Sequence, residues 1–100
     1  MINNVMELVF FNLKENVEVE EFKNASITFQ TLVEQQDGFI FRHLVVDKNN
    51  KWGDIVVWDT MEHAQAMEKV LETSEIAGIY FQYINMETIE IKHVDIIQKF

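Results

Sequence analysis

The residues best suited to chemistry lie close together in the middle of the chain, on two segments with the composition of β-strands. Asp54 stands between Trp52 and Trp58, and Arg42 and His43 lie on the preceding apolar segment. A carboxylate that is desolvated beside aromatic rings has a raised pKa and can act as a general base. His43 is a second candidate, because the unperturbed pKa of histidine is about 6.5. We predict Asp54 and His43 as the candidate catalytic residues.

Each of these residues also has a purely structural explanation. An ion pair between Asp54 and Arg42 across the expected hairpin would account for both without catalysis, and ion pairs also shift pKa values. Trp58 has a similar alternative, because large aromatic residues on strands mostly pack in the core. Strand periodicity does not indicate whether Arg42 or His43 faces a pocket. We therefore keep Arg42 and Trp58 as candidate substrate-binding residues beside these structural roles.

Glu7 interrupts the apolar run Val5–Leu13, where an unpaired buried carboxylate would be costly. It could face a ligand cavity together with Val9 and Phe11, and Phe11 is a further candidate substrate-binding residue. We favour a different interpretation of Glu7, in which it pairs with Arg42 or lies at the solvated end of its strand.

Methionine and aromatic residues in the second half of the chain could line an adaptable apolar pocket, because Met fits irregular ligands. The set comprises Met61, Met67, Met86, Tyr80, Phe81 and Tyr83. We take Met67 and Tyr80 as candidate substrate-binding residues, although ordinary core packing explains the set equally well.

The three histidines do not predict a metal site. His63 falls in the first turn of an expected helix among acidic neighbours, which is typical of a solvated residue. His93 and Asp95 stand two apart on one face of the last expected strand, but two ligands without a third do not make a site. We predict no metal, and no motif indicates a cofactor, since the three glycines are too far apart for a phosphate-binding loop.

Composition limits the chain to a few classes of protein. One hundred residues with 48% hydrophobic content fit a single domain over residues 1–100. The formal net charge of −9 repels phosphate backbones and anionic lipids, which argues against nucleic-acid and membrane partners. Without cysteine, the chain forms no disulfide and has no thiolate chemistry. Its first apolar run is too short to cross a bilayer, and we expect a cytoplasmic protein.

The hydrophobic period alternates between that of strands and that of helices. Strands are predicted over Val5–Leu13, Phe39–Val46, Trp52–Asp59 and Tyr83 to about Ile97. Helices are predicted from Glu18 to a stop at Asp37-Gly38 and from Met61 to about Glu72, with Thr60 as N-cap and a short turn from Thr73 to Ile76. The order β-α-β-β-α-β predicts an α+β, ferredoxin-like fold, a four-stranded antiparallel sheet with two helices on one face.

The first and third predicted strands are apolar on both faces. On the first, Met6 and Leu8 alternate with Val9 and Phe11, although helices would cover only one face of the sheet. A bare second face would be a larger apolar patch than soluble monomers usually expose. We therefore predict a homodimer in which two sheets pack face to face.

Several segments together resemble the antibiotic biosynthesis monooxygenase group of dimeric α+β barrel proteins. The shared features are the Gly38-Phe39 strand entry, a strand that ends in Trp58, and a helix start with Thr60, Glu62 and Ala64. The resemblance implies an oxygenase that uses O₂ without a cofactor on a small aromatic ligand, of the quinol or anthrone kind.

Only some of the substrate-binding residues of this group are present in the chain. Members that oxidise polyketides bind substrate through an amide and a Trp four apart on the third strand, and through a Tyr early in the next helix. The matching positions here are Asp54, Trp58 and Ala64, so a carboxylate replaces the amide and the phenol is missing. The main alternative is therefore a non-catalytic protein of the same fold that binds a small ligand.

A haem-binding or haem-degrading protein is a less favoured alternative. His43 or His93 would then be the axial ligand. At the positions that haem-degrading members use, this chain has Val9, Met67 and a residue near Tyr80. These substitutions argue against haem degradation of that type.

Overall fold

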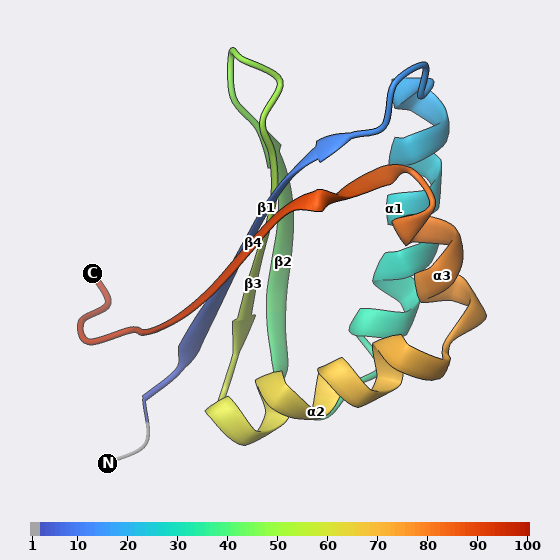
Figure 1. Ribbon diagram of the computed structural model, residues 1–100. Coiled ribbons are helices and arrows are strands. Elements are labelled where there is room, and N and C mark those ends of the chain that lie inside the picture. Colours follow the sequence, from blue (N-terminus) through green and yellow to red (C-terminus); the bar gives the residue numbers. More distant parts are fainter. Residues whose placement is uncertain (1–2) are drawn as a thin grey trace.

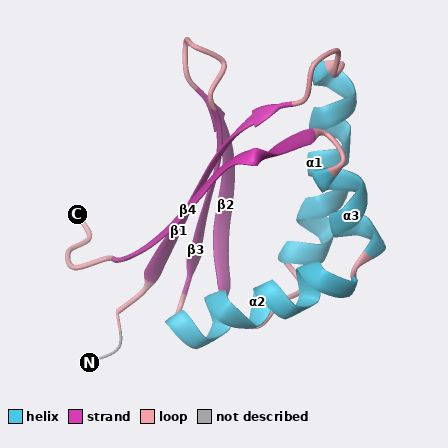
Figure 2. Ribbon diagram, in the orientation of Figure 1, coloured by secondary structure: helices cyan, strands magenta, loops and turns pink. Residues whose placement is uncertain are grey.

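Four antiparallel strands form one sheet, and three helices cover one of its faces (Figures 1 and 2). The computed structural model describes residues 3–100. The strands are β1 (Val5–Leu13), β2 (Phe39–Val46), β3 (Trp52–Trp58) and β4 (Ile84–Asp95), in the order β2-β3-β1-β4. The helices are α1 (Val19–Val33), α2 (Met61–Thr73) and α3 (Glu75–Phe81). This is the ferredoxin-like α+β arrangement predicted from the sequence.

The long helix α1 begins where it is predicted but ends at Val33, before the expected stop at Asp37-Gly38. Its buried stripe consists of Phe22, Ser26, Phe29 and Val33. Thr60 caps α2 as expected, because its hydroxyl accepts a hydrogen bond from the backbone N–H of His63 at 3.2 Å. Within residues 3–100, no helix is both long and apolar enough to span a membrane.

The segment after α2 differs from its prediction. A short turn through Ile76 is expected there, whereas the chain forms a further helix, α3, capped by Ser74. This helix has two buried residues, Ala77 and Tyr80, too few to give a helical period in the sequence. Its effect is to bring Tyr80 beneath the sheet, stacked on the Phe29 ring with 4.4 Å between ring centroids.

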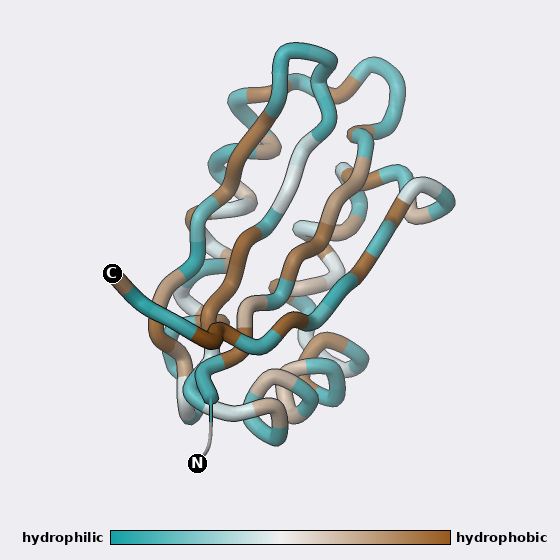
Figure 3. Tube along the Cα trace, turned by 90° about the vertical axis from the view of Figure 1, so that its left-hand side faces the viewer, coloured by the Kyte–Doolittle hydropathy of each residue, from teal (hydrophilic) through white to brown (hydrophobic). Residues whose placement is uncertain are grey.

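The sheet face opposite the helices carries no covering element within residues 3–100 (Figure 1), and Figure 3 shows the hydrophobic stretches of the strands. The register places apolar residues of β1 and β3 on this face, with Lys92 and Glu90 of β4 at its edge. Cross-strand pairs place Leu8 beside Ile55 and Phe10 beside Gly53 on this open face. A Cβ added at Gly53 would meet the Phe10 ring at 2.9 Å, so the two strands pack closely here. On β2, Val45 also lies on this face and is 41% exposed.

The turn between α1 and β2 depends on Gly38. Its φ is +82°, the left-handed region that glycine enters at little cost. Its carbonyl accepts a hydrogen bond from the Asp59 backbone N–H at 2.8 Å, and an added Cβ would collide with the side chains of Asp59 and His63. Gly38 therefore ties the end of α1 to the start of α2.

We expect Gly38→Ala to lower the free energy of unfolding by about 2 kcal/mol or more, from the left-handed conformation and the collision together. The matched control is Gly78→Ala, because nothing lies within 4 Å of a Cβ added there and the residue is helical. That change should stabilise the protein by about 0.5–1 kcal/mol. Urea unfolding at one protein concentration measures both, and equal effects would contradict this role for Gly38.

Candidate functional site

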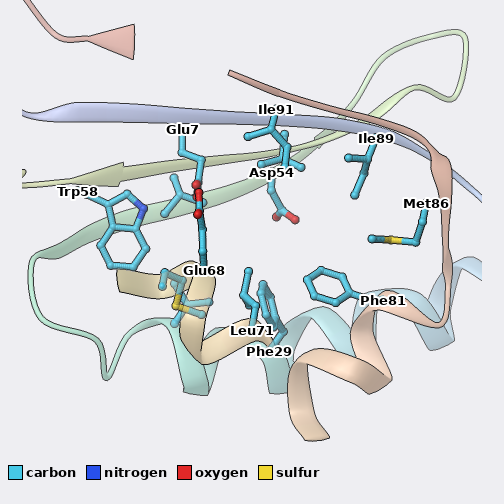
Figure 4. A pocket seen from close by; sticks show the side chains of 14 residues that line it. Glu7, Phe29, Asp54, Trp58, Glu68, Leu71, Phe81, Met86, Ile89 and Ile91 are labelled. Atoms are coloured by element: carbon cyan, nitrogen blue, oxygen red, sulfur yellow. The ribbon is translucent and has the colours of Figure 1, made fainter. Parts of the chain in front are cut away.

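A cavity of about 280 Å³ lies between the sheet and the helices, near the low end of the volumes usual for ligand sites (Figure 4). Its wall is mainly apolar. The apolar lining residues include Val9, Phe29, Val56, Trp58, Met67, Leu71, Phe81, Met86, Ile89 and Ile91. Three carboxylates interrupt this wall, from Glu7 on β1, Asp54 on β3 and Glu68 on α2.

Asp54 is the most fully bonded of these carboxylates. Its Oδ1 accepts a hydrogen bond from Arg42 Nε at 2.8 Å and forms a salt bridge with Arg42 Nη2, also at 2.8 Å. Its Oδ2 accepts a hydrogen bond from the Tyr80 hydroxyl at 2.6 Å. The Arg42 and Asp54 side chains are only 4% and 9% exposed. The ion pair weighed in the sequence analysis is therefore present, and both oxygens of Asp54 have partners.

Arg42 also joins the sheet to helix α1. Its Nη2 donates to Ser26 Oγ at 2.8 Å, and its Nη1 donates to the Ser26 carbonyl at 3.2 Å. The guanidinium carbon lies 4.9 Å from the centroid of the Phe29 ring, a cation–π contact. One buried cation thus connects β2 and β3 to both α1 and α3.

The burial of this network affects its two titratable acids. Burial raises the pKa of Asp54, and the charge of Arg42 opposes the increase. Burial and the neighbouring Asp54 carboxylate raise the pKa of Tyr80 above its ordinary value. Tyr80 therefore keeps its proton at neutral pH and acts as a hydrogen-bond donor to Asp54.

Glu7 lies elsewhere in the cavity and pairs with His93. The two residues are directly opposite each other on β1 and β4, and His93 Nε2 is 2.8 Å from Glu7 Oε2. The favoured interpretation of Glu7 is wrong, because it neither contacts Arg42 nor lies at a solvated strand end. Burial raises the pKa of Glu7, although the hydrogen bond and charge of His93 partly offset this.

Trp58 brings a free hydrogen-bond donor to the same part of the cavity. The residue is fully buried, and its Nε1 is the one buried side-chain nitrogen or oxygen without a partner among residues 3–100. Figure 4 shows the indole nitrogen turned toward the carboxylate of Glu7. An unpaired buried N–H is costly, so a ligand that supplies an acceptor gains from this position.

The structure separates the residues predicted from the sequence into three groups. Asp54, Trp58 and Met67 line the cavity, and Arg42 and Tyr80 lie behind Asp54 as its partners. The other two predicted residues lie away from the cavity lining. Phe11 is fully buried against Phe22, with 6.1 Å between ring centroids. His43 is exposed on the open sheet face, beside Ile55.

The sequence analysis missed several lining residues. Phe29 and Leu71 are on predicted helices, but nothing in the sequence indicates that they border an empty space. The partner of Glu7 is 86 positions away, and only the pairing of β1 with β4 brings His93 to it. Within the described part of the chain, no three His, Cys, Asp or Glu residues are grouped closely enough to hold a metal ion.

Comparisons with solved structures identify the fold. A variant of SnoaB, a cofactor-independent oxygenase from Streptomyces nogalater, is similar with a TM-score of 0.78 and 16% identity, over 97% of this chain and 96% of that one. A Bordetella bronchiseptica protein proposed to be an antibiotic biosynthesis monooxygenase has a TM-score of 0.79 and 13% sequence identity, over 98% of this chain and 98% of that one. The hydroxynitrile lyase of Passiflora edulis has a TM-score of 0.73 and 11% sequence identity, over 100% of this chain and 99% of that one.

Comparisons of sequence give no match. No protein-family profile matches the chain, and no curated protein is similar to it at the sequence level. The chain therefore has the fold of the antibiotic biosynthesis monooxygenase proteins, as the resemblance implies, and the neighbours sharing that fold include an oxygenase and a lyase by name. Fold alone does not choose between such activities, because the function of a protein is set by the residues of its site.

We expect Arg42→Met to lower the free energy of unfolding by about 3–5 kcal/mol, because it leaves the Asp54 carboxylate buried without its counter-charge. Adding Asp54→Asn should recover part of this loss. The matched control is Lys23→Met, which removes an exposed ion pair with Glu20 at 3.3 Å and should change stability by no more than about 0.5 kcal/mol. Urea unfolding reports all three, and an Arg42→Met protein as stable as the control would refute the role assigned to this cation.

Proposed function

We propose that the protein is a cofactor-independent monooxygenase that oxidises a small quinol-like or anthrone-like substrate with O₂. The observation that carries the proposal is the unpartnered indole N–H of Trp58 inside an otherwise apolar cavity. Such a donor suits an oxygen atom that becomes negatively charged during the reaction. The shared fold with a cofactor-independent oxygenase supports the same conclusion.

The chemistry requires little from the protein beyond deprotonation and shelter from water. The enol form of an anthrone loses its O–H proton, and the resulting anion passes an electron to O₂. Recombination forms a carbon–oxygen bond, and loss of water leaves the quinone, so one O₂ gives one quinone and one water. An aromatic-lined cavity excludes water from the reactive anion. The walls supplied by Phe29, Phe81 and Trp58 meet this requirement.

The residues predicted from the sequence take different parts in this proposal. Trp58 binds the substrate oxygen, and Met67 contributes to the apolar wall. Asp54 has both oxygens engaged by Arg42 and Tyr80, so we assign it the positioning of the cavity wall. His43 faces away from the cavity, which leaves proton transfer to another group.

The charges of the cavity favour a neutral substrate. Glu7, Asp54 and Glu68 are acidic lining residues, whereas the one nearby guanidinium, on Arg42, is already paired with Asp54. A ligand with a carboxylate or phosphate would meet unbalanced negative charge at low dielectric. A neutral phenol or enol avoids this repulsion.

We also propose that two copies associate through the open sheet face. Its apolar residues on β1 and β3, with Leu8 and Ile55 at the centre, form the kind of contiguous patch that a partner sheet would cover. The two cavities would then lie on the outer sides of the paired sheets, each under its own helices.

A non-catalytic protein that binds a small ligand is the second candidate. The observation that favours it is the complete engagement of Asp54, which leaves the residue first predicted as a base without a free oxygen. A haem protein is less well supported, because His43 faces away from the cavity and His93 Nε2 is bonded to Glu7. Binding of an aromatic ligand without consumption of O₂ would select this second candidate.

The proposed reaction predicts O₂ uptake with anthrone as probe, with one anthraquinone formed for each O₂ consumed. We expect Trp58→Phe to lower kcat/KM about 100-fold, because it removes a donor to the developing oxyanion. Trp52→Phe is the matched control, since Trp52 packs on Phe22 outside the cavity lining and should leave turnover unchanged. An oxygen electrode and the quinone absorbance measure both. No uptake above the rate without protein would contradict the proposal for this substrate class.

The proposed dimer predicts that Leu8→Glu yields a monomer, because each copy would bury an unpaired carboxylate in the sheet interface. Ile79→Glu provides the control, since Ile79 is on α3, away from the open face, and is 51% exposed. It should leave the dimer intact. Sedimentation equilibrium at micromolar concentration distinguishes the two masses, and a monomeric starting protein would disprove the association.

A further inference from the structure

We propose that Glu7, positioned by His93, is the general base of the cavity. The inference builds on the proposed oxygenase function and supplies its missing proton acceptor. In this assignment Glu7 takes the proton from a phenolic or enolic hydroxyl group of the substrate. His93 contacts Glu7 and not the substrate, so it is a positioning residue.

The position of Glu7 meets the geometric requirement for a base. Its side chain extends from the middle of β1 toward the helices and lines the cavity, and it is 14% exposed. The register of β1 with β4 places His93 directly opposite, where its Nε2 holds Glu7 Oε2 at 2.8 Å. His93 bonds only to Oε2, so Oε1 is available to a substrate beside the indole N–H of Trp58, which acts on the same carboxylate.

Glu7 differs in this respect from the other two carboxylates of the cavity. Asp54 accepts a hydrogen bond on each of its two oxygens, and the ion pair with Arg42 balances its charge. Glu68 is exposed and has no histidine partner among the described residues. Glu7 alone among the three combines burial, a fixed orientation and a free oxygen.

The surroundings of Glu7 make its carboxylate more basic than an exposed one. Burial raises its pKa, and the negative charge of Glu68 acts in the same direction. His93 acts in the opposite direction through its hydrogen bond and charge, and the indole N–H of Trp58 also lowers the pKa of Glu7. Asp54 lines the cavity as well, but it is paired with Arg42. A base whose pKa lies closer to that of its substrate transfers protons more effectively.

Trp58 completes the arrangement. Its indole N–H acts on the Glu7 carboxylate, toward which it is turned in Figure 4, so one substrate oxygen can contact both. The O–H bond of the substrate breaks, its proton goes to Glu7 Oε1, and the electron pair stays on the oxygen. The resulting oxyanion accepts a hydrogen bond from the Trp58 N–H, which has no other partner within residues 3–100.

A matched pair of ligands tests this contact without any turnover. Both 1-naphthol and 1-methoxynaphthalene offer an oxygen to Trp58, but only the naphthol has a proton for Glu7. We expect the protein to bind the naphthol at least tenfold more tightly under anaerobic conditions, because a hydrogen bond to a charged acceptor forms with only one of them. Fluorescence or calorimetric titration measures both affinities.

Two conservative variants identify the carboxylate that is responsible. Glu7→Gln should reduce the preference for the naphthol to about twofold or less, while affinity for the ether stays unchanged. Glu68→Gln removes the same charge from the cavity rim and should keep the full preference. A Glu7→Gln protein that retains the preference, or a Glu68→Gln protein that loses it equally, would overturn the inference.

A His93→Gln variant tests the positioning role through its pH dependence. In the unaltered protein, the naphthol preference should disappear as the pH falls and Glu7 becomes protonated. Because His93 lowers the pKa of Glu7, removing it should move this loss to higher pH. An unchanged midpoint would show that His93 does not act on Glu7.

Measurements of anthrone turnover distinguish a failure of the Glu7 assignment from a failure of the proposed oxygenase function. Glu7→Gln should lower kcat by 100-fold or more with little change in ether binding, as expected for loss of a general base. If O₂ uptake is unaffected by Glu7→Gln, the base assignment fails and the oxygenase function stands. If the naphthol preference depends on Glu7 but no O₂ is consumed, the contact stands and the oxygenase function fails.

Discussion

The buried guanidinium of Arg42 is the constraint on which the rest of this structure depends. A cation that is only 4% exposed must have its charge balanced and its donors bonded. Asp54 on β3, Ser26 on α1 and Tyr80 on α3 provide these partners. Because these partners come from β3, α1 and α3, bonding this one side chain fixes how α1 and α3 lie on the sheet. The cavity is the space that remains beside this network, enclosed mainly by apolar side chains.

This constraint also divides the polar groups of the cavity into two kinds. Arg42, Asp54 and Tyr80 use their hydrogen-bonding capacity on one another and therefore hold the wall in place. Glu7 and Trp58 lie outside that network and keep a free oxygen and a free N–H. An acceptor and a donor next to each other in an apolar space suit a neutral hydroxyl group that is to become an oxyanion.

Much of the fold follows from local sequence, whereas the site depends on contacts between distant residues. The strands, the cap at Thr60 and the apolar residues of the open face were predicted, because each depends on neighbours within a few positions. The position of Tyr80 was not, since α3 is too short to show a period. The face of the sheet on which His43 lies was not predicted either. It depends on the register of β2 with β3 and on the irregularity between Phe39 and Phe41, and an apolar stretch of sequence indicates neither.

In the proposed function, the cavity binds a neutral aromatic hydroxyl compound through the free N–H of Trp58. The most direct test is a ¹H–¹⁵N spectrum of the two indole groups, of Trp52 and Trp58, during titration with 1-naphthol. We expect the Trp58 indole proton to move downfield as it gains an acceptor, while the Trp52 signal stays in place. A Trp58 signal that does not move at saturating naphthol, or an equal shift of both signals, would contradict it.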